Sequence, residues 1–323
     1  MKINELDALR RVDPAAGIPD GPLTEQELAG LTRIRTRAAA EQQVALATAP
    51  RKPVRRRLVL AGAAATVAVM GASVVVADPF GSTPVTMAAT PPLLDRELAK
   101  GGPAKAELIA LAAKAAQDTT VPGETGAVHT VRTQGWSLWT SVDGDVATSE
   151  VVPGQTELTW SSADRSGKSV QKDPKTGKVT DTTTWTAGTY TPQFSYPLPD
   201  DPERLLAELE VGHHIKENGP SALIAAISDL NRESAPTPAV RSALLTILSG
   251  QRKVVALGPI TDRAGRTGPA FAVETDASGL PTRYILIFDP STGKLLANEE
   301  VLTTRAGKLN VRVPSVISYA LFE

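Results

Sequence analysis

The hydrophobic pattern of the chain is dominated by one uninterrupted stretch, residues 58–77, in which no side chain carries a charge. At about 1.5 Å per residue, a helix of this length spans about 30 Å, which matches the hydrocarbon core of a bilayer. Only Thr66 and Ser73 are polar, so the stretch lacks the polar face of an amphipathic helix in a soluble domain. We therefore predict a transmembrane helix over residues 58–77.

The charges on either side of this stretch predict its orientation. Asp78 follows it, whereas five basic residues precede it: Arg51, Lys52, Arg55, Arg56 and Arg57. Lys and Arg residues close to a span stay on the cytoplasmic side. We predict that residues 1–57 are cytoplasmic, that the chain beyond residue 77 lies outside the membrane, and that these five basic residues determine the topology.

A cleaved export signal is the alternative to an anchor. Val75 and Ala77 place small residues where a signal peptidase cuts, and the three consecutive arginines followed by Leu-Val-Leu are similar to a twin-arginine signal. However, the apolar run exceeds the usual ~7–15 residues of a signal peptide, and the segment before it is far longer than a normal n-region. The sequence favours the anchor and leaves a secreted form as the alternative.

Residues 1–57 have the pattern of short helices. Apolar residues recur at helical spacing, and Thr24 with Glu27 forms a capping-box pattern before an apolar stripe. The segment is too small to bury much of a core by itself. It is therefore either a solvated tail or a pair of helices that fold on a cytoplasmic protein partner.

Beyond the span, residues 78–103 are rich in Pro, Thr, Gly and Ser and are predicted to be a linker. A helix is predicted at 104–117, followed by four short β-prone runs at 127–133, 136–142, 145–152 and 156–162 and another at 178–185, with Asp143–Gly144 as a hairpin turn. Three helices follow between 201 and 249, and the remainder is again β-prone. The first of these helices opens at Asp201–Pro202 and the last at Thr237–Pro238, each with a capping residue before a proline.

This order of elements predicts one extracytoplasmic α+β domain over residues 104–323. Its sheet should be antiparallel and half-barrel-like, with the helices on one face. The full fold prediction is this domain preceded by one transmembrane helix and a short helical cytoplasmic segment.

Composition narrows the function classes. The segment 1–57 carries a net charge of +4 and residues 78–323 carry −5, so no strongly basic nucleic-acid-binding domain is indicated. The chain has no cysteine, which excludes disulfides, thiolate nucleophiles and Cys-ligated metals. No nucleophile elbow, zinc-protease or dinucleotide motif is present. We predict a non-enzymatic protein without a catalytic residue, cofactor or metal.

Two repeated segments and three histidines are the candidates for a phosphate-binding or metal-binding site. "DPKTGKV" at 173 and "DPSTGKL" at 289 contain Gly-Lys but lack the earlier glycine and the following Ser or Thr of a phosphate loop. Both are predicted to be turns, because Asp and Pro start a turn and glycine takes the left-handed position. His213 and His214 are neighbours that point about 100° apart on a helix, and His129 lies on a predicted strand; surface or packing roles are favoured over a metal site.

All four tryptophans lie in the first β-rich stretch: Trp136, Trp139, Trp160 and Trp185. The favoured interpretation is that they form the core and rim of the sheet. The functional alternative is that they line an apolar groove that binds a lipid.

The segments "LDALRRVDPAAGIPDGP" and "ITDRAGRTGPAFAVE…YILIFDPSTGKLLANEEVL", together with the basic-flanked Ala/Val span, resemble a family of uncharacterised actinobacterial single-pass membrane proteins. The resemblance covers nearly the whole chain and implies an actinobacterial membrane protein with one span, but no catalytic residues. The architecture is also similar to transmembrane anti-sigma factors, although their zinc-binding His/Cys signature is absent, and the outer domain looks like the half-barrel of lipoprotein carriers. Both are analogies at the level of fold.

These patterns predict a single-pass protein of the cell membrane, with the bilayer contacted through residues 58–77. Our leading hypothesis is a regulator that couples the outer domain to a cytoplasmic protein partner, with a sigma factor as one hypothesis for that partner. The alternatives are an envelope protein that binds a lipid or lipopeptide ligand, and a cleaved secreted protein.

Overall fold

The computed structural model describes residues 87–119, 128–143 and 146–323, without the side chains of 141–152. The chain divides into two units, residues 1–67 and 68–323, and all described residues belong to the second. The predictions for the cytoplasmic segment, the five basic residues and the span at 58–77 fall outside the described residues. Among the helices that the structure describes, none combines the length and the apolar character needed to cross a membrane.

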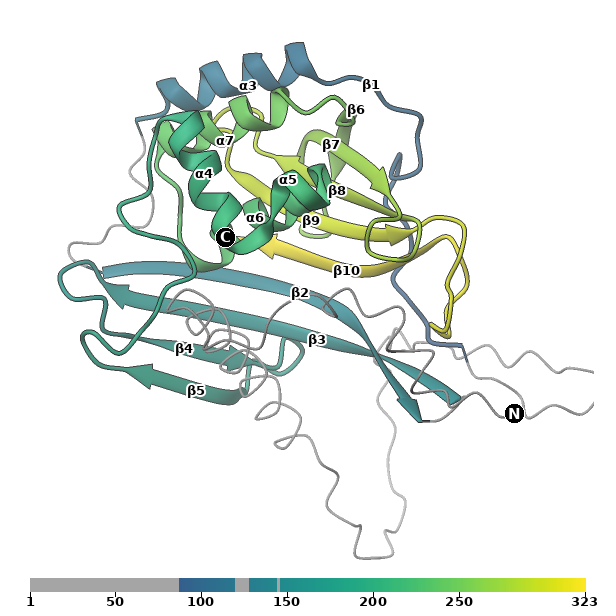
Figure 1. Ribbon diagram of the computed structural model, residues 1–323. Coiled ribbons are helices and arrows are strands. Elements are labelled where there is room, and N and C mark those ends of the chain that lie inside the picture. The colour runs from purple at the N-terminus through teal and green to yellow at the C-terminus, as the bar shows by residue number, and fades with distance from the viewer. Residues whose placement is uncertain (1–86, 120–127, 144–145) are drawn as a thin grey trace, which may run out of the picture. The chain divides into compact units, whose positions relative to one another are not determined.

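Strands and helices alternate in blocks along the described part of the chain (Figure 1). The strands are β1 (Gly102–Pro103), β2 (Val128–Asp143), β3 (Val146–Ser161), β4 (Gly167–Lys172), β5 (Val179–Trp185), β6 (Val255–Thr261), β7 (Thr267–Thr275), β8 (Thr282–Phe288), β9 (Leu295–Leu302) and β10 (Ser315–Phe322). The helices are α3 (Lys105–Gln117), α4 (Pro202–His213), α5 (Ile215–Asn218), α6 (Pro220–Glu233) and α7 (Pro238–Ser249).

All of these strands join one open sheet in the order β1-β6-β7-β8-β9-β10-β2-β3-β4-β5. Each pairing within it is antiparallel. The last strand, β10, lies between β9 and β2, so it joins the C-terminal strands to the long N-terminal hairpins. The prediction of an α+β fold with an antiparallel sheet is confirmed.

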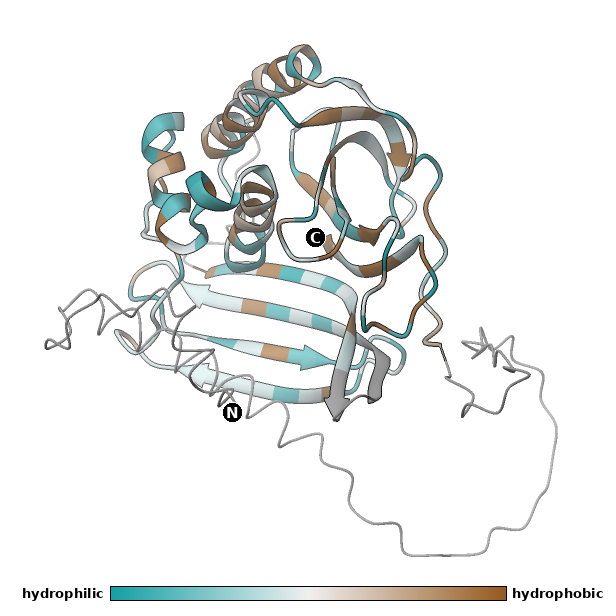
Figure 2. Ribbon diagram, turned by 45° about the vertical axis from the view of Figure 1, so that its right-hand side comes forward, coloured by the Kyte–Doolittle hydropathy of each residue, from teal (hydrophilic) through white to brown (hydrophobic). Residues whose placement is uncertain are grey.

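The helices bury one face of the sheet. Phe271 and Leu286 belong to the same hydrophobic cluster as the apolar faces of α3, α4, α6 and α7. Their neighbours Ala272 and Ile285 belong to a second cluster, because successive residues of a strand point to opposite faces. Figure 2 shows hydrophobic residues gathered in the helices and in β6–β10, whereas β2–β5 are mostly polar. The core therefore lies around the C-terminal half of the sheet.

Two predicted helix starts are confirmed by their caps. The Asp201 side chain accepts a hydrogen bond from the Arg204 backbone N–H at 2.9 Å, and Pro202 is the first residue of α4. Thr237 accepts one from the Val240 N–H at 3.3 Å, and Pro238 opens α7. These caps satisfy donors that a helix N-terminus leaves free.

The β-prone runs before residue 162 differ from their prediction. We predicted four short strands, whereas the structure forms two 16-residue strands, β2 and β3. The two predicted breaks, at Gly135 and at Pro153–Gly154, face each other in the ladder, since Gly135 pairs with Gly154. A Cβ at Gly135 would lie 2.1 Å from the Tyr319 carbonyl oxygen, so this glycine allows β10 to approach β2 rather than ending the strand.

Candidate functional site

Residues 88–100, here called the strap, run across the sheet before β1 and α3; Figure 1 draws them as the blue trace that leads into β1. Leu93 and Leu94 pack against the second hydrophobic cluster, on the face opposite the helices. The strap then continues into β1, which pairs with β6. Residues 78–103 were predicted to be a linker, and the described part of that range is packed on the domain.

Polar contacts hold the strap at several points along its length. Near its start, the Ser315 hydroxyl donates to Thr90 Oγ1 at 2.8 Å. In its middle, Arg96 Nε donates to the Leu257 carbonyl oxygen at 3.0 Å. Near its end, Arg283 Nη1 donates to the carbonyl oxygens of Glu97 and Ala99, at 2.8 and 3.0 Å. These contacts reach β6, β8 and β10, so the strap is bonded to three strands of the sheet.

A cluster of buried charges lies under the strap. Glu97 and Glu299 are each 1% exposed. Arg263, in the turn after β6, donates from Nη2 to Glu299 Oε2 at 2.7 Å, and the same nitrogen is 4.0 Å from Glu97 Oε1. Its guanidinium carbon lies 4.9 Å from the centroid of the Tyr319 ring. The cluster therefore holds two carboxyl groups and one guanidinium in the interior.

Burial is the main reason why the pKa of Glu97 is raised to about 9. The hydrogen bond and the charge of the neighbouring Glu299 carboxyl group add to this effect, and the Leu94 N–H and Arg263 offset it only in part. Burial also raises the pKa of Tyr319, against the opposing charge of Arg263. At neutral pH the Glu97 carboxyl group is thus protonated and uncharged.

A second polar cluster joins the hairpins to the helix layer. Arg165, between β3 and β4, places its guanidinium carbon 4.0 Å from the centroid of the Tyr196 ring. Its Nη2 is 3.9 Å from Glu233 Oε1 at the end of α6, and its carbonyl oxygen accepts a hydrogen bond from Trp185 Nε1 at 2.6 Å. Burial raises the pKa of Glu233 despite the nearby backbone N–H of Gln193 and the charge of Arg165. This cluster tethers the polar hairpins to α6.

The structure brings together two of the four tryptophans that were considered for an apolar groove. Gly167 pairs with both Trp160 and Trp185 in neighbouring strands, so all three share one row on the helix face. Trp136 faces the other way and lies 5.9 Å, between ring centroids, from Tyr319. Trp139 is 54% exposed near the end of the hairpin. The four side chains therefore do not line a common surface.

Two hollows lie between described residues of the domain, and neither is lined by a tryptophan. One, of about 270 Å³, is bounded by Glu107, Ala110, Leu111, Lys114, Pro259, Pro269 and Pro290, which belong to α3, β6, β7 and the turn after β8. The other, of about 140 Å³, lies among β3, β4 and β5. Both are smaller than the ~300–1,000 Å³ of most small-molecule pockets.

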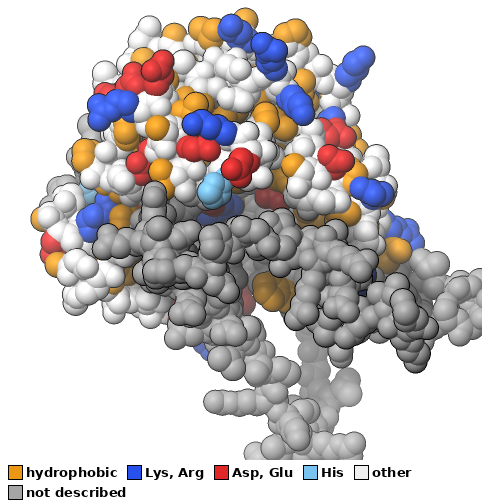
Figure 3. All heavy atoms as spheres, in the orientation of Figure 1, with side chains coloured by type: hydrophobic (Ala, Val, Ile, Leu, Met, Phe, Trp, Pro, Cys, Tyr) orange, Lys and Arg blue, Asp and Glu red, His pale blue; other side chains and the backbone are white. Residues whose placement is uncertain are grey.

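The histidines do not form a shared site: His213 and His129 have packing partners, whereas His214 is exposed after the end of α4. His213 stacks on Phe194 and its Nε2 lies 3.1 Å from Asp229 Oδ2. Burial alone would raise the pKa of Asp229, but the hydrogen bond with His213 and the charge of Arg232 lower it. His129 stacks on Trp160. Within the described part of the chain no group of three His, Asp or Glu side chains is placed to hold a metal. Figure 3, in the orientation of Figure 1, shows a histidine side chain at the surface with acidic and basic side chains beside it.

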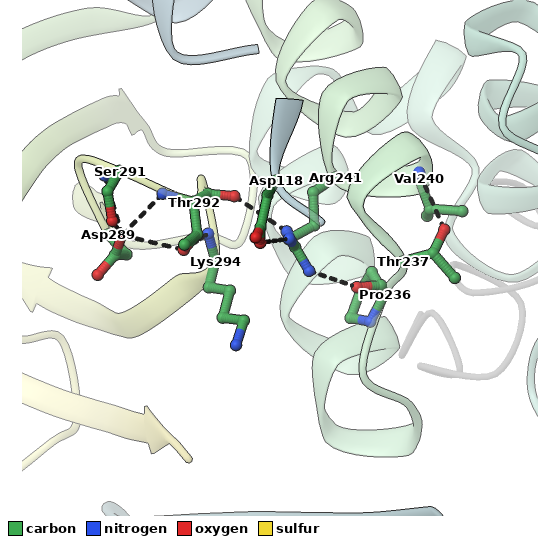
Figure 4. Close-up of polar contacts among 9 residues, drawn as sticks. All are labelled: Asp118, Pro236, Thr237, Val240, Arg241, Asp289, Ser291, Thr292 and Lys294. Atoms are coloured by element: carbon green, nitrogen blue, oxygen red, sulfur yellow. Dashed lines mark hydrogen bonds and ion pairs between the residues drawn. The ribbon is translucent and has the colours of Figure 1, made fainter. Parts of the chain in front are cut away.

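The two Asp-Pro-x-Thr-Gly-Lys segments are turns, as predicted. In each, the first carboxylate accepts hydrogen bonds from the backbone, and the glycine has a positive φ of 67° or 64°. The second turn is also bound to the helices, because Arg241 Nε donates to the Thr292 carbonyl oxygen at 3.0 Å (Figure 4). Arg241 also donates to the Pro236 carbonyl oxygen and pairs with Asp118. This buried clamp is structural.

The sequence analysis did not predict the buried charge cluster under the strap, although one feature of the sequence indicates it. Glu299 and Glu300 are adjacent acids inside the apolar run of β9. Neighbouring residues of a strand face opposite sides of the sheet. If β9 is buried on both faces, these two acids must therefore lie in the interior, one on each face. Burial raises the pKa of Glu300 on the helix face, in keeping with this.

Comparisons with protein-family models, with curated proteins and with solved structures found no match. The actinobacterial family resemblance therefore stays a prediction.

Proposed function

We propose that this protein is a non-enzymatic, single-pass regulator of the cell membrane, whose outer domain is coupled to a cytoplasmic protein partner. In this proposal residues 58–77 anchor the chain and residues 1–57 contact the partner, for which a sigma factor is the working hypothesis. The observation that carries the proposal is the strap, because it is the first described segment after the predicted span in the sequence and it is packed on the domain.

A regulator that works across a membrane needs a mechanical link between its two sides. A freely flexible linker would let the outer domain change without consequence for the span. The strap instead packs Leu93 and Leu94 on the sheet and is bonded to three of its strands. A shift of the sheet therefore moves the residues that lead back to the membrane, which supports coupling.

The polar clusters support a role without catalysis. Arg263, Arg241 and Arg165 each pair with a carboxylate and with backbone or aromatic groups of the same domain. The buried ring of His213 is held by Asp229 and by stacking on Phe194. These groups are engaged in holding segments together rather than converging on a space for a substrate.

We further infer that the sheet is half-barrel-like. Helix α6 contacts β2 as well as β7 and β8, although β7 and β2 are four positions apart in the sheet order. At about 4.8 Å per strand these two strands would be about 19 Å apart in a flat sheet, which is close to the length of the 14-residue α6, so these contacts are compatible with a sheet that curves around the helix. The lipid-binding alternative is not favoured, because Leu223, Ile227 and Leu230 of α6 are buried in one hydrophobic cluster with residues of the sheet.

The topology can be tested with single cysteines, because the chain has none of its own. Lys175→Cys lies in the exposed turn after β4, and Gln26→Cys lies in the predicted cytoplasmic segment. A membrane-impermeant maleimide should label the first variant in intact cells and the second only after permeabilisation. The opposite pattern would refute the proposal, and a shorter product in the medium would favour the cleaved secreted form.

The partner can be tested by purifying the tagged full chain from membranes, beside a variant that lacks residues 2–50. The proposal expects one protein, such as a sigma factor, to accompany the full chain in a defined ratio and to be lost with the truncation. If the same proteins accompany both forms, residues 1–57 are only a tail and the regulatory role fails.

A further inference from the structure

Glu97 is the point at which the strap enters the interior of the domain. Its carboxyl group is faced by Glu299 from β9 and by Arg263 from the turn after β6, with Tyr319 of β10 beneath that guanidinium. On the strap itself, the Leu94 N–H donates to Glu97 Oε2 at 2.8 Å. Arg283 of β8 reaches the Glu97 backbone carbonyl oxygen rather than the carboxyl group.

The charges of this cluster do not balance when both carboxyl groups are ionised. Arg263 is bonded to Glu299 at 2.7 Å, whereas the same nitrogen is 4.0 Å from Glu97. One carboxylate is therefore neutralised and the other would be a buried, unpaired charge, which costs much more than a buried ion pair.

The free oxygens of the two carboxyl groups indicate how this cost is avoided. Neither Glu97 Oε1 nor Glu299 Oε1 has a hydrogen-bond donor among the described residues. The two carboxyl groups flank the same Arg263 nitrogen, at 4.0 Å from Glu97 Oε1 and 2.7 Å from Glu299 Oε2, and the neighbouring Glu299 carboxyl group raises the pKa of Glu97. A single proton held between them satisfies both oxygens and removes the extra charge in one step.

We propose that Glu97 and Glu299 share one proton and that this proton is a latch, which fastens the strap to the sheet when bound and loosens it when lost. The latch itself is a property of the described residues. Its use as a signal, in which the acidity outside the membrane sets the tension on the span, rests on the proposed function.

The direction of the effect follows from linkage. The pKa of Glu97 is about 9 with the strap in place, and a released strap would return it to its ordinary value near 4.5. The attached form thus binds a proton that the released form lacks between these two values. The equilibrium constant for attachment of the strap is therefore highest below about pH 4.5. It falls by up to about tenfold per pH unit between this value and about pH 9.

The experiment is hydrogen exchange of the backbone amides of residues 88–100, on the full chain in detergent micelles, from pH 5 to 9. After correction for intrinsic exchange, protection reports the local opening equilibrium. We expect wild-type protection to fall by up to about tenfold per pH unit. Glu97→Gln, which cannot ionise, should keep its protection up to pH 9 and lose the slope.

Two further variants complete the test. Glu157→Gln removes a carboxylate that also pairs with an arginine, Arg132 at 2.9 Å, but lies away from the strap; it should leave the slope unchanged. Glu299→Gln frees Arg263 for Glu97, so the slope should vanish there as well, which keeps the test decisive if Glu97→Gln folds poorly.

Equal slopes in the wild type and in both latch variants would overturn the proposal. So would a wild-type strap whose protection is flat from pH 5 to 9. Neither readout depends on membrane orientation or on a partner, so a cytoplasmic location of Lys175→Cys would refute the proposed function and leave the latch intact.

Discussion

Replacing Gly135 by alanine should destabilise the domain by about 3 kcal/mol, because the added methyl group would collide with backbone rather than with a mobile side chain. Its Cβ would lie 2.1 Å from the Tyr319 carbonyl oxygen and 3.0 Å from Ala320 Cα. Both atoms belong to β10, whose pairing with β2 joins the two halves of the sheet. The strands must separate locally, and the ladder bonds nearby are weakened.

The matched control lies directly across the ladder. Gly154 pairs with Gly135, and a Cβ at Gly154 meets no atom within 4 Å. Neither residue has a positive φ, so alanine can adopt the φ angle at both positions, and the two variants differ only in what the added Cβ meets. Gly154→Ala should be neutral or more stable by up to about 1 kcal/mol, because alanine has less freedom to lose on folding.

Chemical denaturation followed by tryptophan fluorescence measures both variants. Trp136 is the neighbour of Gly135 and packs on Tyr319, so the folded Gly135→Ala protein should also show a red-shifted emission. If the two glycine variants have the same midpoint and the same emission, β10 and β2 do not approach each other as closely as described.

Local chemistry allowed much of the fold to be predicted. The caps at Asp201 and Thr237 and the two Asp-Pro-x-Thr-Gly-Lys turns depend on residues within a few positions of one another, and they occur where the sequence placed them. The blocks of helices and strands likewise confirm an α+β fold. Such features need no knowledge of distant partners.

What the sequence concealed depends on contacts between remote segments. Gly135 looks like a strand end until β10 is placed beside it, almost 200 residues later in the chain. Glu97 lies in a proline-rich stretch typical of linkers, and its partners Arg263 and Glu299 belong to β-rich segments far away. Only the register of β9, which turns Glu299 toward the strap, makes one cluster of them.

The tryptophans illustrate the same limit in a different way. Their spacing could not show that Trp136 and Trp160 face opposite sides, because that depends on strand parity within β2 and on the pairing of β3. The structure places Trp160 beside His129 and Trp136 beside Tyr319. A groove formed by all four side chains would have required one shared face.

Replacing Arg241 by alanine is expected to lower the free energy of unfolding by about 3–5 kcal/mol, the usual cost of breaking a buried ion pair from one side. Arg241 is 3% exposed and connects three segments: the end of α3 through Asp118, the loop before α7 through Pro236, and the turn after β8 through Thr292. Figure 4 shows the guanidinium at the meeting point of these segments. Its removal takes the guanidinium away from a buried carboxylate and from two carbonyl oxygens.

Two companion variants separate the contribution of the planar set of guanidinium donors of Arg241 from the contribution of its positive charge. Arg241→Lys keeps the charge but not the planar set of donors, so it should recover only a minor part of the loss. Asp118→Ala combined with Arg241→Ala should be less destabilised than Arg241→Ala alone, because the buried carboxylate is then removed together with its guanidinium partner. Circular dichroism during urea denaturation measures all three.

The control for this prediction is Arg132→Ala. Arg132 also pairs with a carboxylate, at 2.9 Å from Glu157, but its side chain is 53% exposed, so its loss should cost less than about 1 kcal/mol. If Arg241→Ala were no more destabilised than Arg132→Ala, the three segments would not depend on the clamp. The packing of the second turn, where a Cβ at Gly293 would lie 2.9 Å from Ala115 Cβ and Leu245 Cδ1, would then have to hold α3, α7 and the sheet together by itself.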